Sequence, residues 1–540
     1  MSSIRSRGSR LAGALALSSL LLSACGGGGS ASDGDDAKAE AGGNVTIGLN
    51  SALACLDPHQ NSSNTTIFIA RSIADSLTDQ DPETGDLEPW LATKWTQNAD
   101  ATSYTFTLRD DVTFSDGTAF TAQSVKDNFD TIKKLTPAVA PLANNYLSGY
   151  SGSKVIDDHT VQVDFETPNV QFLQGTSTIT LGIFGEKTLK QTAEQRCQGD
   201  LVATGPFTVK SYKPEQETVL AKRDGYAWGS PLRQHTGDAY LDTATFKIIP
   251  EAGVRTGQLR SGELDLDTIP LTEDVTAFEK DPGFKVIGRP YPGLGVNLIP
   301  NLQRPVLQDK DVRRALVEGI DRDELVKGVF TTYDKAPTSP LTSVTPLFEK
   351  IPGVRYDPQD AASLLDGAGW KLGSDGIREK DGKKLTLTAV YHFSRQSTPA
   401  MELVQQQLRK IGVDLKILLP SPADLAKYST SGDYDLWFTP FHRAEPDAIR
   451  STLSFYAGNT GKAPKARPVD ELLTKQSQET DPAKRQQLVT EAATALVDEG
   501  YVVPLYELAG LFVTTSRVHD LVFEASSRLN LYDVWVSQDS

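Results

Sequence analysis

From Lys384 to Phe441 the chain reads "KLTLTAVYHFSRQSTPAMELVQQQLRKIGVDLKILLPSPADLAKYSTSGDYDLWFTPF". Three apolar runs of strand length, which begin near residues 384, 413 and 434, alternate with two segments of helical periodicity. The order β-α-β-α-β is typical of a parallel sheet with right-handed crossovers. This stretch therefore predicts an α/β fold.

The first of the two helical segments has well-marked ends. Thr398 precedes Pro399, and Gly412 follows the last turn, so we expect Thr398 to be the N-cap and Pro399 the first helical residue. Upstream, apolar residues at helical spacing predict a helix over 309–330 and a shorter one over 357–370.

A polar loop follows the third strand of this unit. Ligands of open parallel sheets bind beyond the carboxyl ends of the strands. The loop contains His442, Arg443, Glu445 and Asp447, and it follows an aromatic strand end that includes Trp437. We take it as the first candidate for a ligand site. The alternative is a solvated turn in which Asp447 caps a helix over 448–456.

The first half of the chain has a different character. Apolar residues alternate in 44–50, 103–117 and 159–166, as they do in half-buried strands. Two further strands around Lys213-Pro214 predict a hairpin, and Thr121 predicts the start of a helix over 121–134. The class of structure therefore changes near residue 290, and we expect at least two lobes.

Length and charge limit the function. A chain of 540 residues can form two or three domains, each with its own core. The formal net charge is −16, and we find no basic arm. Because binding to phosphates needs clustered lysine and arginine, we do not expect a nucleic-acid partner.

The N-terminus has the layout of a secretion signal. Arginines precede an apolar stretch over 11–22, which is shorter than the ~20 residues that span a bilayer. Small residues then precede Cys25, and 22–25 ("LSAC") resembles a bacterial lipobox. We therefore expect a lipoprotein signal peptide over 1–24 and lipidation of Cys25. The alternative is an ordinary secretory signal with a chance cysteine.

A glycine- and serine-rich segment over 25–43 follows the lipobox and predicts a flexible linker, so the folded body begins near Asn44. Two further cysteines remain, Cys55 and Cys197. Secretion makes a disulfide between them chemically possible, and two buried free thiols are the alternative.

The chemistry of common enzymes is missing from the sequence. The six histidines show no metal-ligand spacing, and there is no CxxC, P-loop, dinucleotide fingerprint or G-x-S-x-G motif. Glu263, Asp265 and Asp267 could be imagined as acid–base residues, but a solvated strand edge explains them more simply. We expect a binding protein that is not an enzyme and that has no cofactor and no metal site.

Several stretches, in this order along the chain, carry a resemblance to a known family. They are "GDLEPWLATKWTQNADATSYTFTLRDDVTFSDGTAFTAQSVKDNFD" (85–130), "ATGPFTVKSYKPEQETVLAKRDGYAWG" (203–229), "LRSGELD" (259–265), "DVRRALVEGIDRDELV" (311–326), "LLDGAGW" (364–370) and "QQQLRKIGVDLKI" (405–417). From about residue 44 to residue 536, the chain resembles the family 5 extracellular solute-binding proteins of ABC transporters, which bind dipeptides, oligopeptides or nickel.

The resemblance implies a periplasmic-binding-protein type II fold with two lobes, a cleft between them and an additional domain. Lobe I would be discontinuous, and the extra domain and lobe II would be inserted into it. The expected boundaries are 44–80, 200–290 and 510–540 for lobe I, 81–199 for the extra domain, and 291–509 for lobe II. Cys55 and Cys197 would lie at edges of lobe I segments, which makes their pairing sterically reasonable.

The resemblance also implies a role in import. Such a protein captures a solute outside the cell, closes around it and delivers it to an ABC permease that works with a cytoplasmic ATPase. We expect a monomer that is held by its lipid at the outer face of the cell membrane, in the periplasmic space. A surface sensor without a permease and a secreted hydrolase are the alternatives from other classes.

The solute is harder to predict. In peptide-binding members an aspartate near the position of His442 holds the peptide's ammonium group, so the acidic anchor is either missing here or moved to Glu445 or Asp447. Arg443 is a candidate for a ligand carboxylate, or for a salt bridge to one of those two acids. Other contact candidates are Asp57, Asn297 and Trp437, the last with a core position as its alternative. A peptide-type solute is our first prediction, followed by a metal chelate, an oligosaccharide or an amino-acid conjugate.

Overall fold

The computed structural model describes residues 38–392 and 394–537. The predicted signal peptide, Cys25 and most of the predicted linker lie outside these residues. Within them, no helix is both long enough and apolar enough to cross a membrane.

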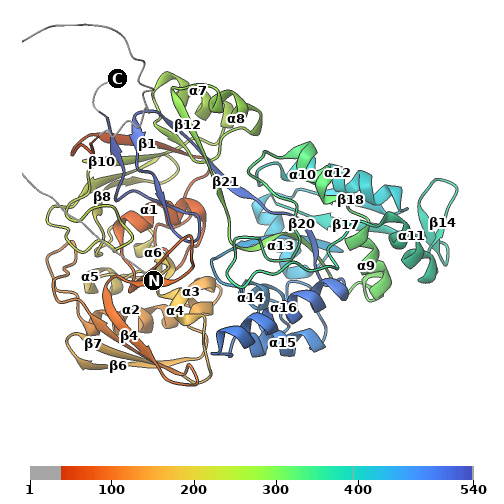
Figure 1. Ribbon diagram of the computed structural model, residues 1–540, viewed down its shortest axis with the longest axis horizontal. Helices are drawn as coiled ribbons and strands as arrows, with labels where there is room; N and C mark the ends of the chain where they lie inside the picture. The colour runs from red at the N-terminus through yellow and green to blue at the C-terminus, as the bar shows by residue number, and fades with distance from the viewer. Residues whose placement is uncertain (1–37, 393, 538–540) are drawn as a thin grey trace, which may run out of the picture. The chain divides into compact units, whose positions relative to one another are not determined.

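A seven-stranded sheet collects strands from distant parts of the chain, in the order β12-β21-β11-β1-β10-β9-β8 (Figure 1). β1 lies in its centre, parallel to both neighbours, and buries Val45, Ile47 and Leu49 as the alternation predicts. β8 and β9 form the predicted hairpin. The strands are β1 (Asn44–Leu49), β8 (Phe207–Lys213), β9 (Glu217–Lys222), β10 (Thr243–Ile248), β11 (Leu266–Asp267), β12 (Phe284–Pro290) and β21 (Ala509–Thr515).

A four-stranded antiparallel sheet has the order β4-β5-β7-β6. The helix α2 (Ala122–Lys134) packs on this sheet and begins after Thr121, as predicted. Tyr104 and Phe106 of β5 pack against Phe172, and their cluster is continuous with the core of the seven-stranded sheet. The strands are β4 (Ala92–Gln97), β5 (Ser103–Leu108), β6 (Tyr150–Asp157) and β7 (Thr160–Phe165).

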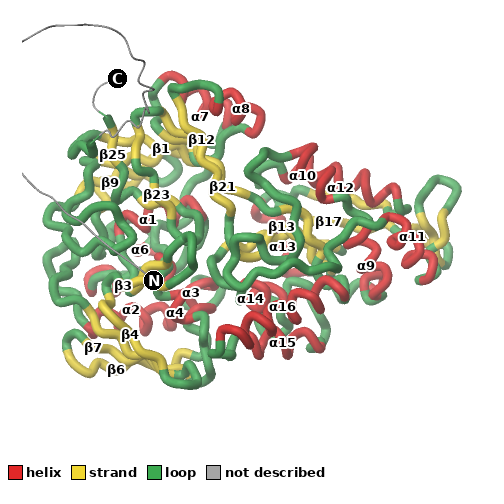
Figure 2. Tube along the Cα trace, in the orientation of Figure 1, coloured by secondary structure: helices red, strands yellow, loops and turns green. Residues whose placement is uncertain are grey.

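A five-stranded sheet with its own hydrophobic core has the order β18-β17-β19-β13-β20. β17 is parallel to both β18 and β19, which confirms the predicted parallel unit, whereas β13 runs antiparallel to its two neighbours. Figure 2 shows these strands among helices that include α9, α12 and α16. The strands are β13 (Gly293–Pro300), β17 (Thr386–Val390), β18 (Asp414–Leu418), β19 (Leu436–His442) and β20 (Val503–Tyr506).

The helix α12 (Ser397–Lys410) begins earlier than predicted, and the expected cap at Thr398 is wrong. The N-cap is Gln396, which has left-handed backbone angles. The backbone N–H of Ser394 donates to the Ser397 hydroxyl (3.1 Å), and the N–H of Ser397 donates to the Ser394 carbonyl (3.0 Å). This turn brings Ser397 into the first helical turn, where Pro399 is still tolerated because backbone N–H groups there need no helical partner.

The single helix expected over 309–330 is also wrong, because two helices form there. α9 (Lys310–Glu318) ends at Gly319, and α10 (Arg322–Val329) begins after Asp321. The Asp321 carboxylate accepts a hydrogen bond from the backbone N–H of Glu324 (2.9 Å) and so caps a new helix. The predicted helix over 357–370 forms as α11 (Pro358–Gly367), and the second helical segment between residues 384 and 441 forms as α13 (Pro422–Ser431).

Shorter elements and the remaining helices complete the described chain. Small two- or three-stranded sheets join β2 with β3, β14 with β15 and β16, β22 with β25, and β23 with β24. These strands are β2 (Thr78–Gln80), β3 (Leu87–Pro89), β14 (Lys371–Leu372), β15 (Arg378–Lys380), β16 (Lys383–Lys384), β22 (Val518–His519), β23 (Val522–Phe523), β24 (Leu529–Asn530) and β25 (Trp535–Val536). The helices are α1 (Asn64–Ile73), α3 (Pro141–Tyr146), α4 (Phe172–Gly175), α5 (Glu186–Leu189), α6 (Ala193–Arg196), α7 (Ala252–Ser261), α8 (Thr272–Glu279), α14 (Ala448–Leu453), α15 (Pro468–Gln476) and α16 (Pro482–Asp498), with 3-10 turns η1 (Ile179–Leu181) and η2 (Pro305–Leu307).

The described chain passes between the two larger sheets twice, from β12 into β13 and from β20 into β21. The two passages lie next to each other, because β12 and β21 pair along their whole length, up to the pair Pro290–Ala509. The change of class predicted near residue 290 falls at this point. The division into lobe I, an extra domain and lobe II stays a prediction, and the membership of the sheets supports it.

Candidate functional site

A narrow cavity is lined by three parts of the chain that are far apart in sequence. Its walls come from residues 142–180, from the loop that follows β19, and from the C-terminal segment 524–528, with Ile67 of α1 beside them. Its volume is about 20 Å³, close to the space that a single water molecule needs. The predicted ligand loop after β19 therefore does line a cavity, at the carboxyl end of a parallel strand.

His442 ends β19 and lies at this cavity, as predicted. Its ring stacks on Tyr291, with centroids 4.4 Å apart and planes 9° from parallel. Burial and the nearby charge of Arg528 lower the pKa of His442 to about 3. The imidazole is therefore neutral at physiological pH and provides no charge to a ligand.

Arg443 also lines the cavity and is only 2% exposed. One terminal nitrogen donates to the Asn145 side-chain oxygen (3.0 Å) and the other to the Gln171 side-chain oxygen (2.6 Å). The guanidinium lies over the ring of Tyr146 at 4.3 Å, and its Nε has no hydrogen-bond partner. The alternative of a salt bridge to Glu445 or Asp447 is wrong, because neutral amide oxygens hold the cation instead.

The two acids of the same loop do not line the cavity and are already paired. Glu445 forms an ion pair with Arg485, and Asp447 accepts two hydrogen bonds from Arg450 (2.7 and 2.8 Å). Asp447 occupies the N-cap position of α14, but its side chain makes no capping hydrogen bond, so the cap alternative is wrong for the carboxylate. Both carboxylates that could replace the acidic anchor therefore already have an arginine partner.

The C-terminal segment supplies a second arginine that the sequence reading missed. Arg528 is 8% exposed, and its Nε donates to the Asn64 side-chain oxygen (3.1 Å). A terminal nitrogen of Arg528 reaches the carbonyl of His442 (3.4 Å), which places the two residues in contact. Burial lowers the pKa of Arg528, although Glu524 opposes the shift. The segment "FEASSRLN" (523–530) follows no motif, so no local signal could have identified this arginine.

The predicted contacts Asp57, Asn297 and Trp437 do not line the cavity. Asp57 is fully buried and binds Arg196 (2.9 Å). Asn297 lies inside β13, where its Nδ2 donates to the carbonyl of Gly295 (2.6 Å). Trp437 packs on Tyr434 at the edge of the core of the five-stranded sheet. These three side chains have structural partners, and Trp437 is a partly buried residue that packs against the core.

Cys55 and Cys197 are joined by a disulfide next to Asp57, in agreement with the predicted pairing. The acidic residues of 263–267 differ from the prediction, because Asp265 and Asp267 are buried rather than solvated. Asp265 pairs with Arg517 (3.0 Å) and Asp267 with Arg255 (2.9 Å). Asp267 thus neutralises the buried Arg255, whereas the partner of Asp265, Arg517, is partly exposed.

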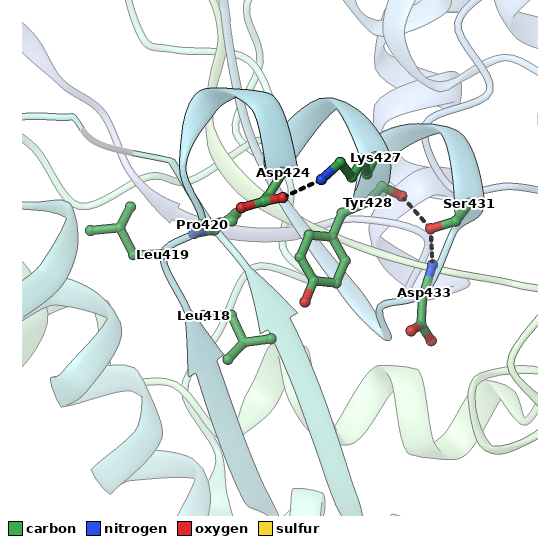
Figure 3. Close-up of a pocket in the computed structure, with 8 residues that line it drawn as sticks. All are labelled: Leu418, Leu419, Pro420, Asp424, Lys427, Tyr428, Ser431 and Asp433. Carbon is green, nitrogen blue, oxygen red and sulfur yellow. Dashed lines mark hydrogen bonds and ion pairs between the residues drawn. The ribbon is translucent and has the colours of Figure 1, made fainter.

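A second concavity, shown in Figure 3, lies where β18 meets α13 at the edge of the five-stranded sheet. It measures about 460 Å³ and is open, and the paired side chains of Asp424 and Lys427 lie at its rim (2.7 Å). None of the predicted site residues lines it. No group of histidine, cysteine or acidic side chains in the described residues is arranged to hold a metal ion.

Comparison with known proteins agrees with this architecture. Residues 86–463 match the profile of the bacterial extracellular solute-binding proteins, family 5 (middle region). The nickel-binding periplasmic protein of Escherichia coli (strain K12) is 25% identical over 461 residues, which cover 81% of this chain and 84% of that protein. Protein XP55 of Streptomyces lividans is 28% identical over 524 residues, which cover 92% of this chain and 89% of that protein.

Solved structures show the same fold. NikA from Brucella suis in complex with Fe(III)-EDTA has a TM-score of 0.80 at 24% identity, covering 92% of this chain and 100% of that one. DppA from Helicobacter pylori in complex with the peptide STSA has a TM-score of 0.76 at 22% identity, covering 92% of this chain and 99% of that one. The fold is thus the two-lobed α/β fold of type II periplasmic binding proteins. Because the family profile spans most of its length, the chain belongs to the bacterial extracellular solute-binding proteins, family 5.

Proposed function

We propose that the protein is the substrate-binding lipoprotein of an ABC importer, which captures a peptide-type solute in the cavity beside Arg443 and delivers it to a membrane permease. The proposal rests on one observation, which is that the walls of the cavity come from different parts of the fold. The loop after β19 belongs to the five-stranded sheet, whereas residues 142–180 and 524–528 pack with the other two sheets. A solute held there touches both parts of the protein and stabilises their contact.

The size of the cavity requires that the protein opens to admit a solute. About 20 Å³ holds a water molecule but no peptide. The two adjacent passages between the larger sheets, at 290–293 and 506–509, are the places where a hinge can bend. The bonds from Arg443 to Asn145 and Gln171 join the two parts of the protein in the form described here, so a bound solute would hold the two parts further apart than this form does. A ligand that binds the closed form more tightly then shifts the population toward it.

The printed names of the relatives cover several solutes, including nickel, dipeptides and oligopeptides. A peptide-type solute follows the majority of these names. A metal chelate or an amino-acid conjugate is the second candidate. Neither needs a protein carboxylate to hold a free ammonium group, and the carboxylates of Glu445 and Asp447 are already paired with arginines. An oligosaccharide is the third. The relatives are binding proteins, which agrees with a role without turnover of the solute.

The lipid anchor at Cys25 is part of the same proposal, since the lipobox and linker would hold the folded body at the outer face of the membrane. Replacing Cys25 by serine should release the protein from the membrane fraction. A Cys25→Ser protein that remains membrane-bound and labelled by a radioactive fatty acid would contradict the anchor without affecting the solute-binding role.

The binding role is tested with purified full-length protein and a pooled panel of peptides, chelates, conjugates and sugars. We expect at least one class to raise the melting temperature and to reduce the radius of gyration in solution scattering. Mass spectrometry should recover that solute unchanged. Turnover of the solute would instead support the hydrolase, and binding without any loss of uptake in a deletion strain would support the sensor. The same scattering data check the expected monomer.

A further inference from the structure

We infer that the solute carries a carboxylate or a similar planar anion, and that Arg443 and Arg528 hold this group. The inference rests on the proposed solute-binding role of the cavity and names the charge of what it binds. A free peptide held by its terminal ammonium group would need an acidic side chain in the cavity. The cavity instead has two arginines, so the inference differs from that expectation.

The balance of charge at the cavity is the first argument. Arg443 and Arg528 both line it, are both more than nine-tenths buried, and have no ion-pair partner among the described residues. Glu524 is the one carboxylate that lines the cavity within the described chain, and it is ion-paired with Arg71. The cavity therefore has an excess of buried positive charge. A buried charge without a counter-charge is costly, and an incoming anion removes this cost.

The hydrogen bonds of Arg443 are the second argument. Asn145 and Gln171 accept from its terminal nitrogens and fix its plane, but as neutral amides they leave its charge uncompensated. Its Nε is buried without a partner, so one donor of the guanidinium is unused. A guanidinium presents its donors in a planar fork that matches a carboxylate. The contact with Tyr146 supports the guanidinium from one face.

A third observation concerns another residue of the cavity wall, Gln174. Gln174 lines the cavity, is 7% exposed, and its side-chain oxygen has no hydrogen-bond partner. Its amide nitrogen donates to the side-chain oxygen of Gln80 (3.2 Å), so the nitrogen has a partner whereas the oxygen has none. An N–H or O–H group of the solute would satisfy this oxygen. The cavity thus suits a solute with an anionic group near the arginines and a neutral donor near Gln174.

These features separate solute classes by charge. The C-terminal carboxylate of a peptide, the carboxylate of an amino-acid conjugate and the carboxylates of an anionic chelate share the chemistry that the arginines recognise. A neutral sugar or a cationic chelate lacks it. His442 does not change this balance, because it stacks on Tyr291 as a neutral ring.

The test uses matched pairs of probes on the purified full chain, with affinities from calorimetry. The pairs are a pooled dipeptide library and the same library as C-terminal amides, Fe(III)-EDTA and the carboxylate-free tris(ethylenediamine)nickel(II), and digalacturonate and lactose. We expect the carboxylate-bearing member of at least one pair to bind, and its carboxylate-free partner to bind at least about 30-fold more weakly. The pair that responds identifies the source of the carboxylate.

Variants locate the effect. Arg443→Gln and Arg528→Gln should each reduce the affinity for the carboxylate-bearing probe by about 30-fold, so that both members of the pair bind about equally. Arg443→Lys should keep part of the preference for the carboxylate. Arg409→Gln, at an exposed position on α12, is the matched control and should change nothing. The probe pairs test the inference on the unaltered chain even when a variant fails to fold.

The outcomes are distinguishable. If neutral or cationic members bind within threefold of their anionic partners, the inference is wrong while the solute-binding role stands. The same holds if both glutamine variants fold and keep the ratio of the unaltered chain. If no member of any pair binds, the proposed function fails and the inference fails with it.

Discussion

Replacing Asp75 with asparagine should change how the stability of the protein depends on pH. Asp75 follows α1 and is fully buried in the core that the seven-stranded and four-stranded sheets share. Its carboxylate accepts hydrogen bonds from the indole N–H of Trp228 (3.0 Å) and the hydroxyl of Tyr226 (3.3 Å). Burial raises the pKa of Asp75 from 3.8 to about 6, and the hydrogen bond from Trp228 and the charge of Arg71 oppose this shift without cancelling it.

The sign of the effect follows from linkage. Because the pKa of Asp75 is higher in the folded state than in the unfolded state, its contribution to stability is fully present below pH 3.8 and is lost as the pH rises through about 6. A shift of about two units corresponds to about 3 kcal/mol of unfolding free energy. Asparagine does not ionise and keeps a side-chain oxygen for Trp228. Relative to Asp75→Asn, the natural chain should therefore lose about 2.5 kcal/mol between pH 4 and pH 8, because about 0.5 kcal/mol of the total is already lost at pH 4.

The assay is urea denaturation of both proteins at a series of pH values, because their difference cancels all other titrating groups. Asp224→Asn, at an exposed position in a loop, is the matched control for the loss of a carboxylate. A difference between natural protein and Asp75→Asn that stays constant from pH 4 to pH 8 would refute the reasoning. A difference that changes in the opposite direction would show that hydrogen bonds and Arg71 dominate over burial.

Three further predictions concern the disulfide, the hinge and the loop after β19. Removing the Cys55–Cys197 disulfide by a double change to alanine should reduce the unfolding free energy by up to about 5 kcal/mol, because the bond closes a loop with a sequence separation of 142 residues; an unchanged denaturation midpoint would contradict this. Gly293→Ala should destabilise the protein by at least about 2 kcal/mol and weaken solute binding, since Gly293 has φ +108° and a Cβ would lie 2.6 Å from the backbone nitrogen of Arg443. Thermal melting checks the stability and calorimetry the affinity, and a melting temperature equal to that of the natural protein would count against the prediction. His442 should not make solute affinity depend on pH near 6.5, because burial lowers its pKa to about 3. The affinities of the natural protein and of His442→Ala should therefore keep a constant ratio from pH 5 to pH 8.

Much of the fold could be predicted because its signals are local. Alternating apolar residues predicted β1, β5 and β7, and the β-α-β-α-β order predicted the parallel strands β17, β18 and β19. The errors were at helix ends, where short-range hydrogen bonds of Ser397 and Asp321 outweighed the pattern of caps and apolar spacing. Burial was also misjudged at Asp265 and Asp267, because their arginine partners come from other segments.

The candidate site was predictable only in part. Its loop could be found from its place after a parallel strand, and this reasoning identified His442 and Arg443. The same reasoning included Glu445 and Asp447, whose side chains are bound to Arg485 and Arg450 instead. A position on a loop follows from the order of elements, whereas the direction of each side chain depends on which partners the fold brings near it.

The sequence by itself determined the types of element, the change of class near residue 290 and the family resemblance, because these depend on periodicity and on residues close together in the chain. Only the tertiary structure decided which charges meet. Arg443 reaches Asn145 and Gln171 across 298 and 272 residues, and Arg528 reaches Asn64 across 464. Contacts over such distances arise when sheets and helices pack, so the charge of the cavity is a property of the folded chain and of no single segment.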